Sequence, residues 1–424
     1  MKRLTSSLIV RRFVGVFSID LLVRASGFFL LPVYLRLMTK EEYALYGYLF
    51  SITASAALVL NLGLYVPQVK MYHDLRDDRE KGVLLFTLNF SLLVFLGALL
   101  LPVYFFGLDI LAIKLLFQHG IDYMQYRPYV LGTIFVSVFS LMLYSYFLTS
   151  ERVGRIKLYN LSRLVILNIV VITVLYVSKR DVVRIRLMYP MIIEAGLIVA
   201  FGYVFFLRMV PTFSVDALRK SLKIGLPLML AALANTFYNL SDRFFLEKYH
   251  SLQVMGVYTL GLTLSSITST TMTSFQSIWA PVFYQEKKPI ANLRRVKRIA
   301  LLATGVYALL GAGIVVMTFL LIRYNVINQT YSQVTLVLPI LLTASTCYAI
   351  CQLFQNFMVY FEVTHISLGF HVATNVLCVL LGMLLVPRFG MYGAASALAM
   401  SAACSLGMHY FFVVNRARLS ERVA

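Results

Sequence analysis

Residues 83–106 read VLLFTLNFSLLVFLGALLLPVYFF, and this stretch decides the class of fold. It contains no Asp, Glu, Lys or Arg over 24 residues. A helix needs about 20 consecutive, mainly apolar residues to cross the hydrocarbon core of a bilayer. We therefore predict that residues 83–106 form a transmembrane helix.

The composition of the whole chain agrees with a membrane protein. The 424 residues are 60% hydrophobic and 13% charged, with a mean hydropathy of +0.81, whereas soluble domains carry about 45–50% apolar residues. The predicted fold class is all-α integral membrane, with 12 transmembrane helices at 14–38, 43–66, 83–106, 129–149, 156–177, 187–207, 222–247, 255–284, 299–322, 334–361, 364–387 and 391–414. The connectors are too short for a folded soluble domain, and no signal-peptide pattern is present.

The formal net charge of +20 is explained by membrane topology. Along the twelve predicted helices, Lys and Arg are about twice as frequent in connectors on the side of the N-terminus as on the opposite side. Cytoplasmic connectors carry such an excess, so the N and C termini are both predicted to be cytoplasmic. Connector 178–186 is basic on the opposite side, against this trend. Anionic lipid headgroups suit the basic connectors, and no nucleic-acid partner is expected.

The two halves of the chain show a weak internal similarity. EEYALYGY at 41–48 aligns with QVMGVYTL at 253–260, half a chain apart, and each half contains six predicted helices. Parallel repeats of this kind place a transporter's substrate site at the repeat interface. We therefore predict an N-terminal six-helix lobe at 1–210 and a C-terminal six-helix lobe at 211–424.

Two local patterns predict structural roles. Thr39 followed by Glu42 matches a capping box at the start of the second predicted helix. Cysteines in predicted helices are interpreted as small packing residues, so no disulfide, metal site or cofactor is expected. They are Cys347, Cys351, Cys378 and Cys404.

Three arginines lie inside predicted helices: Arg24, Arg163 and Arg243. An Arg at a helix centre costs about 2.5–3.5 kcal/mol on the insertion scale, so it normally faces a polar cavity or a partner. A purely structural explanation stays open for each. Arg24 can pair with Asp20 one turn earlier, Arg163 can snorkel to the nearer interface, and Arg243 can snorkel or bond to Asp242.

Polar neighbours favour a functional interpretation of these arginines. Asn235, Asn239 and Asp242 recur at i, i+4 and i+7, on one face of the helix predicted at 222–247. His371 is interpreted as a hydrogen-bonded interior side chain, with a proton carrier as the alternative. Arg forks suit phosphate oxygens, while amides and hydroxyls suit sugars. The predicted interior is therefore suited to an anionic, sugar-bearing headgroup.

SDRFFLEKYHSLQVMGVYTLG at 241–261 resembles the segment joining the seventh and eighth helices of Wzx-type polysaccharide flippases. In that family an Asp-Arg pair, apolar residues and a Lys precede a short loop and a Gly-x-Tyr. The matching residues are Asp242, Arg243, Leu246, Lys248, Gly256 and Tyr258. NLGL at 61–64 and SFQSIWAPVFYQE at 274–286 are also similar to the family. Ala44 and Glu247 depart from it, since Gly is common at these positions.

The resemblance implies the polysaccharide transport branch of the MATE/MOP superfamily, with two lobes arranged in a V. It implies a non-enzymatic flippase of a bacterial cytoplasmic (inner) membrane. Its cargo would be undecaprenyl-diphosphate-linked oligosaccharide repeat units for O-antigen, capsule or a similar surface polysaccharide, moved by alternating access through a cationic central cavity. Partners would be this substrate, membrane lipids, H⁺ or Na⁺, and other polysaccharide assembly proteins.

On this interpretation the candidate substrate-binding residues are Arg24, Arg163, Arg243, Asn235 and Asn239. Arg243 and Arg24 would receive the diphosphate or an acidic sugar, and Arg163 would assist. The residues expected to couple an ion or to orient an arginine are Asp20, Asp242 and Glu194.

Two other functions remain open. An ion-coupled antiporter of drugs or organic cations with the same fold would be expected to have a more acidic interior. A membrane glycosyltransferase or polymerase would need catalytic residues in a large outer loop. The longest such loop, at about 107–128, offers only Asp109, His119 and Asp122, and the chain has no P-loop, HExxH or nucleophile-elbow motif.

Overall fold

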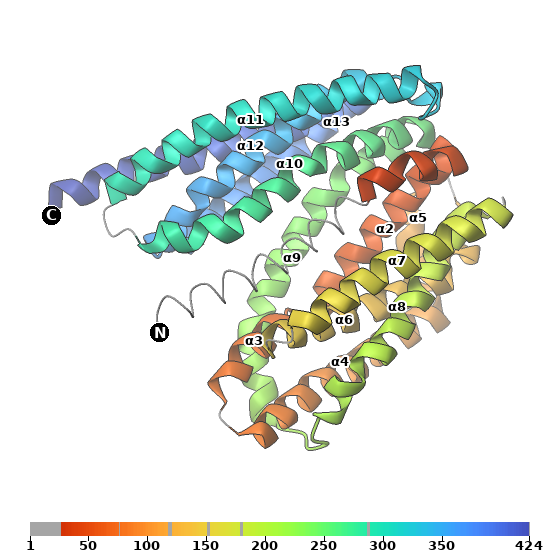
Figure 1. Cartoon of the computed structure of the whole chain (residues 1–424), viewed down its shortest axis with the longest axis vertical. Coiled ribbons are helices and arrows are strands. Elements are labelled where there is room, and N and C mark those ends of the chain that lie inside the picture. Colours follow the sequence, from red (N-terminus) through yellow and green to blue (C-terminus); the bar gives the residue numbers. More distant parts are fainter. Residues whose placement is uncertain are drawn as a thin grey trace. The chain divides into compact units, whose positions relative to one another are not determined.

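The computed structural model describes residues 27–75, 77–117, 121–150, 153–178, 181–285 and 289–423. Within these residues all regular secondary structure is helical, and no strand occurs (Figure 1). The chain divides into two compact units. The N-terminal unit comprises Met1–Met38 and Leu45–Leu240, and the C-terminal unit comprises Thr39–Ala44 and Ser241–Ala424.

The N-terminal unit begins, in its described part, with a short apolar helix at Gly27–Leu37. The elements that follow are α2 (Lys40–Leu60), α3 (Tyr65–Asp74), α4 (Asp78–Phe106), α5 (Leu108–Leu116), η1 (Tyr123–Gln125), α6 (Arg127–Thr149), α7 (Val153–Ser178), α8 (Val182–Leu207) and α9 (Val215–Tyr249). The first residues of α2 and the last residues of α9 belong to the C-terminal unit.

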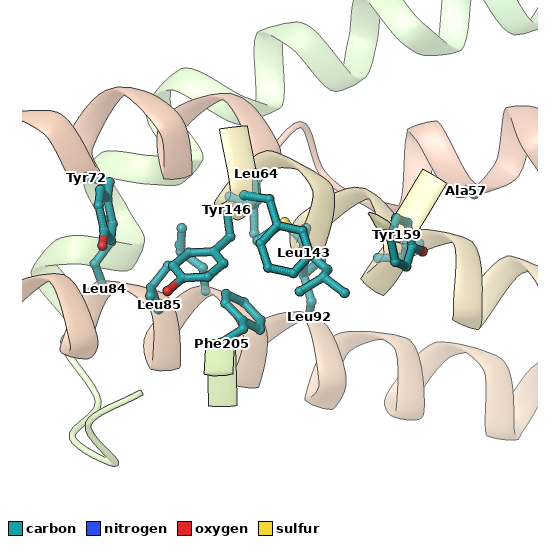
Figure 2. Close-up of a cluster of buried hydrophobic side chains, with 14 of the residues drawn as sticks. Ala57, Leu64, Tyr72, Leu84, Leu85, Leu92, Leu143, Tyr146, Tyr159 and Phe205 are labelled. Atoms are coloured by element: carbon teal, nitrogen blue, oxygen red, sulfur yellow. The ribbon is translucent and has the colours of Figure 1, made fainter. Parts of the chain in front are cut away.

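Apolar side chains form the core of the N-terminal unit (Figure 2). Leu85 and Leu92 of α4, Tyr146 of α6 and Phe205 of α8 are all nearly inaccessible to solvent. The rings of Tyr146 and Phe205 lie 4.8 Å apart between their centroids. Burial of these apolar surfaces holds α4, α6 and α8 together.

A tight turn at residues 61–64 separates α2 from α3. Asn61 Oδ1 accepts the backbone N–H of Tyr65 at 3.2 Å, and Gly63 has a φ of 66°. A Cβ built on Gly63 would lie 2.4 Å from the carbonyl oxygen of Gly225 on α9. Glycine is therefore required at position 63, both for the left-handed backbone and for the close approach of α9.

The described part of the C-terminal unit contains four long helical elements after the end of α9. They are α10 (Leu252–Gln285), α11 (Pro289–Arg323), α12 (Val334–Tyr360) and α13 (Thr364–Val423), with the short η2 (Gln329–Tyr331) before α12. Phe283 and Phe357 are fully buried in the core of this unit, with ring centroids 4.8 Å apart.

Helix α13 consists of two helices joined at Gly390. The backbone there is non-helical, with φ 55° and ψ −130°, a conformation that only glycine adopts readily. A Cβ on Gly393 would lie 2.3 Å from the carbonyl oxygen of Leu385, so the chain changes direction tightly at this point. Residues 364–387 and 391–414, predicted as separate helices, thus lie on the two sides of Gly390.

Among the described residues, nine helices are long and apolar enough to cross a membrane. One of them is the 55-residue stretch His365–Leu419, which contains Gly390. Large apolar side chains such as Phe106 and Leu207, each 79% exposed, project from these helices, as expected for surfaces facing lipid. The protein is therefore a multi-pass membrane protein. Helix α10 is 34 residues long but is not among the nine, because its Ser- and Thr-rich middle lowers its hydropathy.

Two local predictions can be compared with the structure. The capping box is confirmed, since Glu42 accepts the backbone N–H of Thr39 at 2.8 Å and Thr39 accepts that of Glu42 at 3.2 Å. The loop predicted at 107–128 differs, because its apolar residues 108–116 form α5 and residues 123–125 form η1. Gly107, with φ 70°, ends α4 and begins this connection to α6.

We predict that Gly63→Ala destabilises the protein. The left-handed backbone costs a non-glycine residue about 1–2 kcal/mol, and the new methyl group meets the backbone of Gly225. Gly97→Ala is the matched control, since a Cβ there meets nothing within 4 Å and Ala is the better helix former. Thermal unfolding of both variants in detergent should show a lower midpoint for Gly63→Ala alone, and equal midpoints would contradict the packing described.

Candidate functional site

Glu194 on α8 is a buried carboxylate in the N-terminal unit, with 7% of its surface exposed. Ser140 Oγ of α6 donates to its Oε1 at 2.6 Å, and Arg163 Nη2 of α7 donates to its Oε2 at 3.1 Å. An unpaired charge at this depth would carry a large desolvation cost. The arginine and the hydroxyl offset that cost, so three helices meet at one neutralised carboxylate.

Tyr159 extends this arrangement. Its hydroxyl lies 2.9 Å from Ser140 Oγ, and because Ser140 donates its proton to Glu194, Tyr159 donates to Ser140. Tyr159 is 1% exposed, whereas the side chain of Arg163, one turn further along α7, is 45% exposed. Glu194 therefore holds one edge of the Arg163 guanidinium. This group has five N–H donors in all, and it is partly accessible.

Asp242 on α9 is a buried acid of the C-terminal unit, 7% exposed. Tyr258 of α10, which is fully buried, donates its hydroxyl proton to Asp242 Oδ2 at 2.7 Å. The backbone N–H of Arg243 donates to Oδ1, also at 2.7 Å. A hydrogen-bonded carboxylate thus ties α9 to α10.

The Gly-x-Tyr part of the motif has a structural reason. A Cβ on Gly256 would lie 2.4 Å from the carbonyl oxygen of Lys40, so glycine allows the first turn of α2 to contact α10. Two residues later, Tyr258 reaches Asp242. The motif residues around this turn therefore fix the packing of α2, α9 and α10 within the C-terminal unit.

The other predicted site residues are only partly described. Arg243 directly follows Asp242 on α9 and is partly buried. Asn235 and Asn239 lie on the part of α9 that belongs to the N-terminal unit, and their side chains are outside the described residues. Asp20 and Arg24 also lie outside the described residues. The structure brings Arg163 to Glu194, and it brings Asp242 to Tyr258.

An ion pair between Arg127 and Asp109 was missed from the sequence. Arg127 Nε and Nη2 donate to the two Asp109 oxygens at 2.7 and 2.9 Å, and both residues are 8% exposed. Burial and the Asp109 carboxylate raise the pKa of the nearby Tyr123 phenol. The sequence analysis assigned both residues to the loop at 107–128. The only sequence signal for the pair was an acid near the start of this loop and an arginine near its end.

A second missed arginine is Arg186 on α8. Its guanidinium lies 4.1 Å from the ring centroid of Tyr34 and 3.8 Å from that of Tyr46. Tyr34 also donates to Asn168 Oδ1 at 2.9 Å. Stacking of this kind retains the charge of Arg186 beside apolar helices, whereas the sequence placed the residue in a basic loop.

Polar residues also meet between α12 and α13. The rings of His371 and His409 are 5.5 Å apart, Gln355 Nε2 lies 3.3 Å from His371 Nε2, and His409 contacts Ser367. His371 is thus a hydrogen-bonded histidine, as interpreted from the sequence, although it is only partly buried. In the described part of the chain, no group of three or more His, Cys, Asp or Glu residues could hold a metal ion.

Comparisons with known proteins bear on the family and the fold. A family model described as polysaccharide biosynthesis protein matches residues 10–286. No curated protein sequence matches. Solved structures with the same fold include an inward-facing multidrug resistance MATE family transporter of the MOP superfamily (TM-score 0.73, 14% identity, 96% of each chain covered).

Two further structures share the fold at similarly low identity. One is the lipid II flippase MurJ in an inward closed conformation (TM-score 0.72, 15% identity, 94% of this chain and 87% of that chain). The other is a mutant MATE transporter of Vibrio cholerae (TM-score 0.58, 13% identity, 98% of each chain). At such identities the likeness shows the fold alone.

We predict that Tyr258→Phe lowers stability through Asp242. Removing the hydroxyl leaves a buried carboxylate short of one donor, which costs about 1–3 kcal/mol. Tyr331→Phe is the matched control in the same unit, because its hydroxyl is buried without a hydrogen-bond partner in the described residues. Thermal unfolding should therefore separate the two variants, and a similar midpoint for both would argue against the Asp242–Tyr258 bond.

Proposed function

Because the chain belongs to the polysaccharide biosynthesis protein family, we propose that it is a flippase for undecaprenyl-diphosphate-linked oligosaccharide repeat units. It moves them across the bacterial cytoplasmic (inner) membrane by alternating access, for O-antigen, capsule or a similar surface polysaccharide. It acts as a transporter without catalytic residues. The lipid tail stays in the bilayer, and only the charged sugar headgroup needs a polar path.

The proposed architecture has 12 transmembrane helices, in lobes at 1–210 and 211–424, with both termini cytoplasmic. The charge distribution of the connectors supports this orientation. A fold shared with MOP-superfamily transporters supports a transport role for the helices.

The observation that carries the proposal is the pair of Arg163 and Glu194. A half-exposed guanidinium in a membrane helix, fixed along one edge by a buried carboxylate at 3.1 Å, suits an anionic ligand that approaches its other edge. Arg forks bind phosphate oxygens through paired N–H donors. We assign Arg163 to the diphosphate or to an acidic sugar.

Arg24, Arg243, Asn235 and Asn239 complete the proposed substrate-binding set. Arg24 and Arg243 would add positive charge, and the two amides would bind sugar hydroxyls. Coupling to H⁺ or Na⁺ is assigned to three acidic residues, Asp20, Asp242 and Glu194. A carboxylate that binds H⁺ or Na⁺ can release the arginine paired with it, and Glu194 would release Arg163 in this way.

Antiport of drugs or organic cations is the second candidate. It is favoured by the shared fold with a multidrug MATE family transporter and by buried carboxylates such as Glu194 and Asp242. The two functions differ in what binds, since an organic cation needs an accessible acid. Glu194 is instead already paired with an arginine.

We predict that Arg163→Gln lowers surface polysaccharide in cells that depend on this protein. Loss of a charge-assisted hydrogen bond worth about 1.5–3 kcal/mol should weaken substrate binding roughly tenfold to hundredfold. The measurement is surface polymer per unit of membrane-inserted protein. Arg155→Gln on the same helix is the matched control, since Arg155 packs over Tyr203 with 5.8 Å between guanidinium and ring and is outside the proposed site.

Arg163→Lys should retain part of the activity, because it preserves the charge but loses the fork. If Arg163→Gln supports normal polysaccharide at normal protein level, Arg163 serves only as the structural partner of Glu194. If the polymer is normal and export of cationic dyes falls instead, the antiporter function replaces the flippase.

A further inference from the structure

Helices α11, α12 and α13 of the C-terminal unit pack against one another (Figure 1), and side chains of these three helices line a groove. Its volume is about 590 Å³. Among its lining residues, the buried Ile350 and Phe354 of α12 and the partly buried Leu406 and Gly407 of α13 form the floor, and the exposed Leu301 of α11 forms a wall. These residues are apolar and uncharged, so the groove suits a hydrocarbon chain.

Gly407 leaves open space in this floor. A Cβ built on Gly407 would meet nothing within 4 Å, so its small size is not required by the packing of neighbouring helices. The wall residue Leu301 is 76% exposed although it sits on a helix apolar enough to cross a membrane. The groove therefore opens toward the bilayer, where an acyl chain can enter it.

One end of the groove is cationic. Lys297 of α11 lines it, with Nζ 5.1 Å from the ring centroid of Tyr410. Further exposed basic residues lie near Lys297 on α11 and after Tyr410 on α13. They are Arg294, Arg295, Arg298, Arg416 and Arg418.

The groove thus combines an apolar channel with a basic rim at the end where α11 begins and α13 ends. We propose that it is a binding site for an anionic phospholipid, with an acyl chain against Ile350, Phe354 and Gly407 and the headgroup phosphate at Lys297. Basic pockets between transmembrane helices recognise acidic lipid headgroups in this way. The topology predicted from the connectors puts this rim in the cytoplasmic leaflet.

The positive charge of the rim favours an anionic headgroup over a zwitterionic one. A zwitterionic headgroup would bring its own ammonium group to a surface that already carries Lys297 and several arginines, whereas an anionic headgroup carries a net negative charge. The aromatic ring of Tyr410 beneath Lys297 suits the boundary between headgroup and acyl chain. The site depends only on the C-terminal unit and does not require that the cargo be an oligosaccharide lipid.

The test is native mass spectrometry of the full-length protein, delipidated in detergent and then incubated with equal amounts of phosphatidylglycerol and phosphatidylethanolamine. The wild type should retain phosphatidylglycerol preferentially. Lys297→Gln should weaken phosphatidylglycerol binding about fivefold, the contribution of one basic side chain near an anionic surface. Gly407→Leu should abolish the preference, because its side chain occupies the groove.

Two control variants separate the site from general effects. Lys220→Gln removes a lysine paired with Asp216 on α9, and Gly313→Leu adds a side chain to an exposed position of α11 where a Cβ also meets nothing within 4 Å. Both should bind phosphatidylglycerol as the wild type does. Equal retention of the two lipids by the wild type, or unchanged binding by both groove variants, would overturn the proposal. Displacement of phosphatidylglycerol by an undecaprenyl phosphate would also overturn it, by assigning the groove to the cargo lipid.

Discussion

Each described charge inside the membrane helices of this protein must be neutralised or hydrogen-bonded, and the arrangement of helices follows that constraint. Glu194 draws α6, α7 and α8 together through Ser140 and Arg163. Asp242 joins α9 to α10 through Tyr258. Asp109 and Arg127 close the α4–α6 connection. Apolar packing fills the space between helices, and these contacts add bonds between particular pairs of helices, because an unpaired ion in lipid is costly.

The approximate position of many described helices followed from the sequence because it depends on local composition, whereas the predicted helix 43–66 was wrong at its end, since α2 stops at Leu60 and a turn precedes α3. An uncharged run such as 83–106 has no alternative to a helix in a membrane, and α4 covers it. The capping box was predictable for the same reason, since its two residues, Thr39 and Glu42, lie within one turn of helix. The family resemblance seen at residues 241–261 is confirmed by the match of the family model over residues 10–286.

Contacts between distant residues could not be predicted in this way. Arg163 and Glu194 were both recognised as charged residues inside predicted helices, but their pairing across 31 residues depends on how α7 packs against α8. Arg127 and Arg186 looked like loop residues because each lies near the end of an apolar stretch. Their partners, Asp109 for one and two tyrosine rings for the other, become neighbours only in the folded chain.

The fold alone does not decide the cargo. A multidrug resistance MATE transporter, a further MATE transporter and a lipid II flippase share it at 13–15% identity, so different cargoes require different side chains on the same fold. A helix bundle with buried acids can serve either class of substrate. Family membership favours the oligosaccharide lipid, and the partly exposed Arg163 favours an anionic headgroup.

The most direct measurement is mass spectrometry of lipid extracts from host cells that lack this protein but retain the enzymes acting downstream. The flippase account predicts accumulation of a diphosphate-linked oligosaccharide together with loss of its surface polymer, and the extract would identify the cargo. Unchanged lipid-linked sugars in cells that have lost the export of a cationic dye would contradict the account and establish the antiporter in its place.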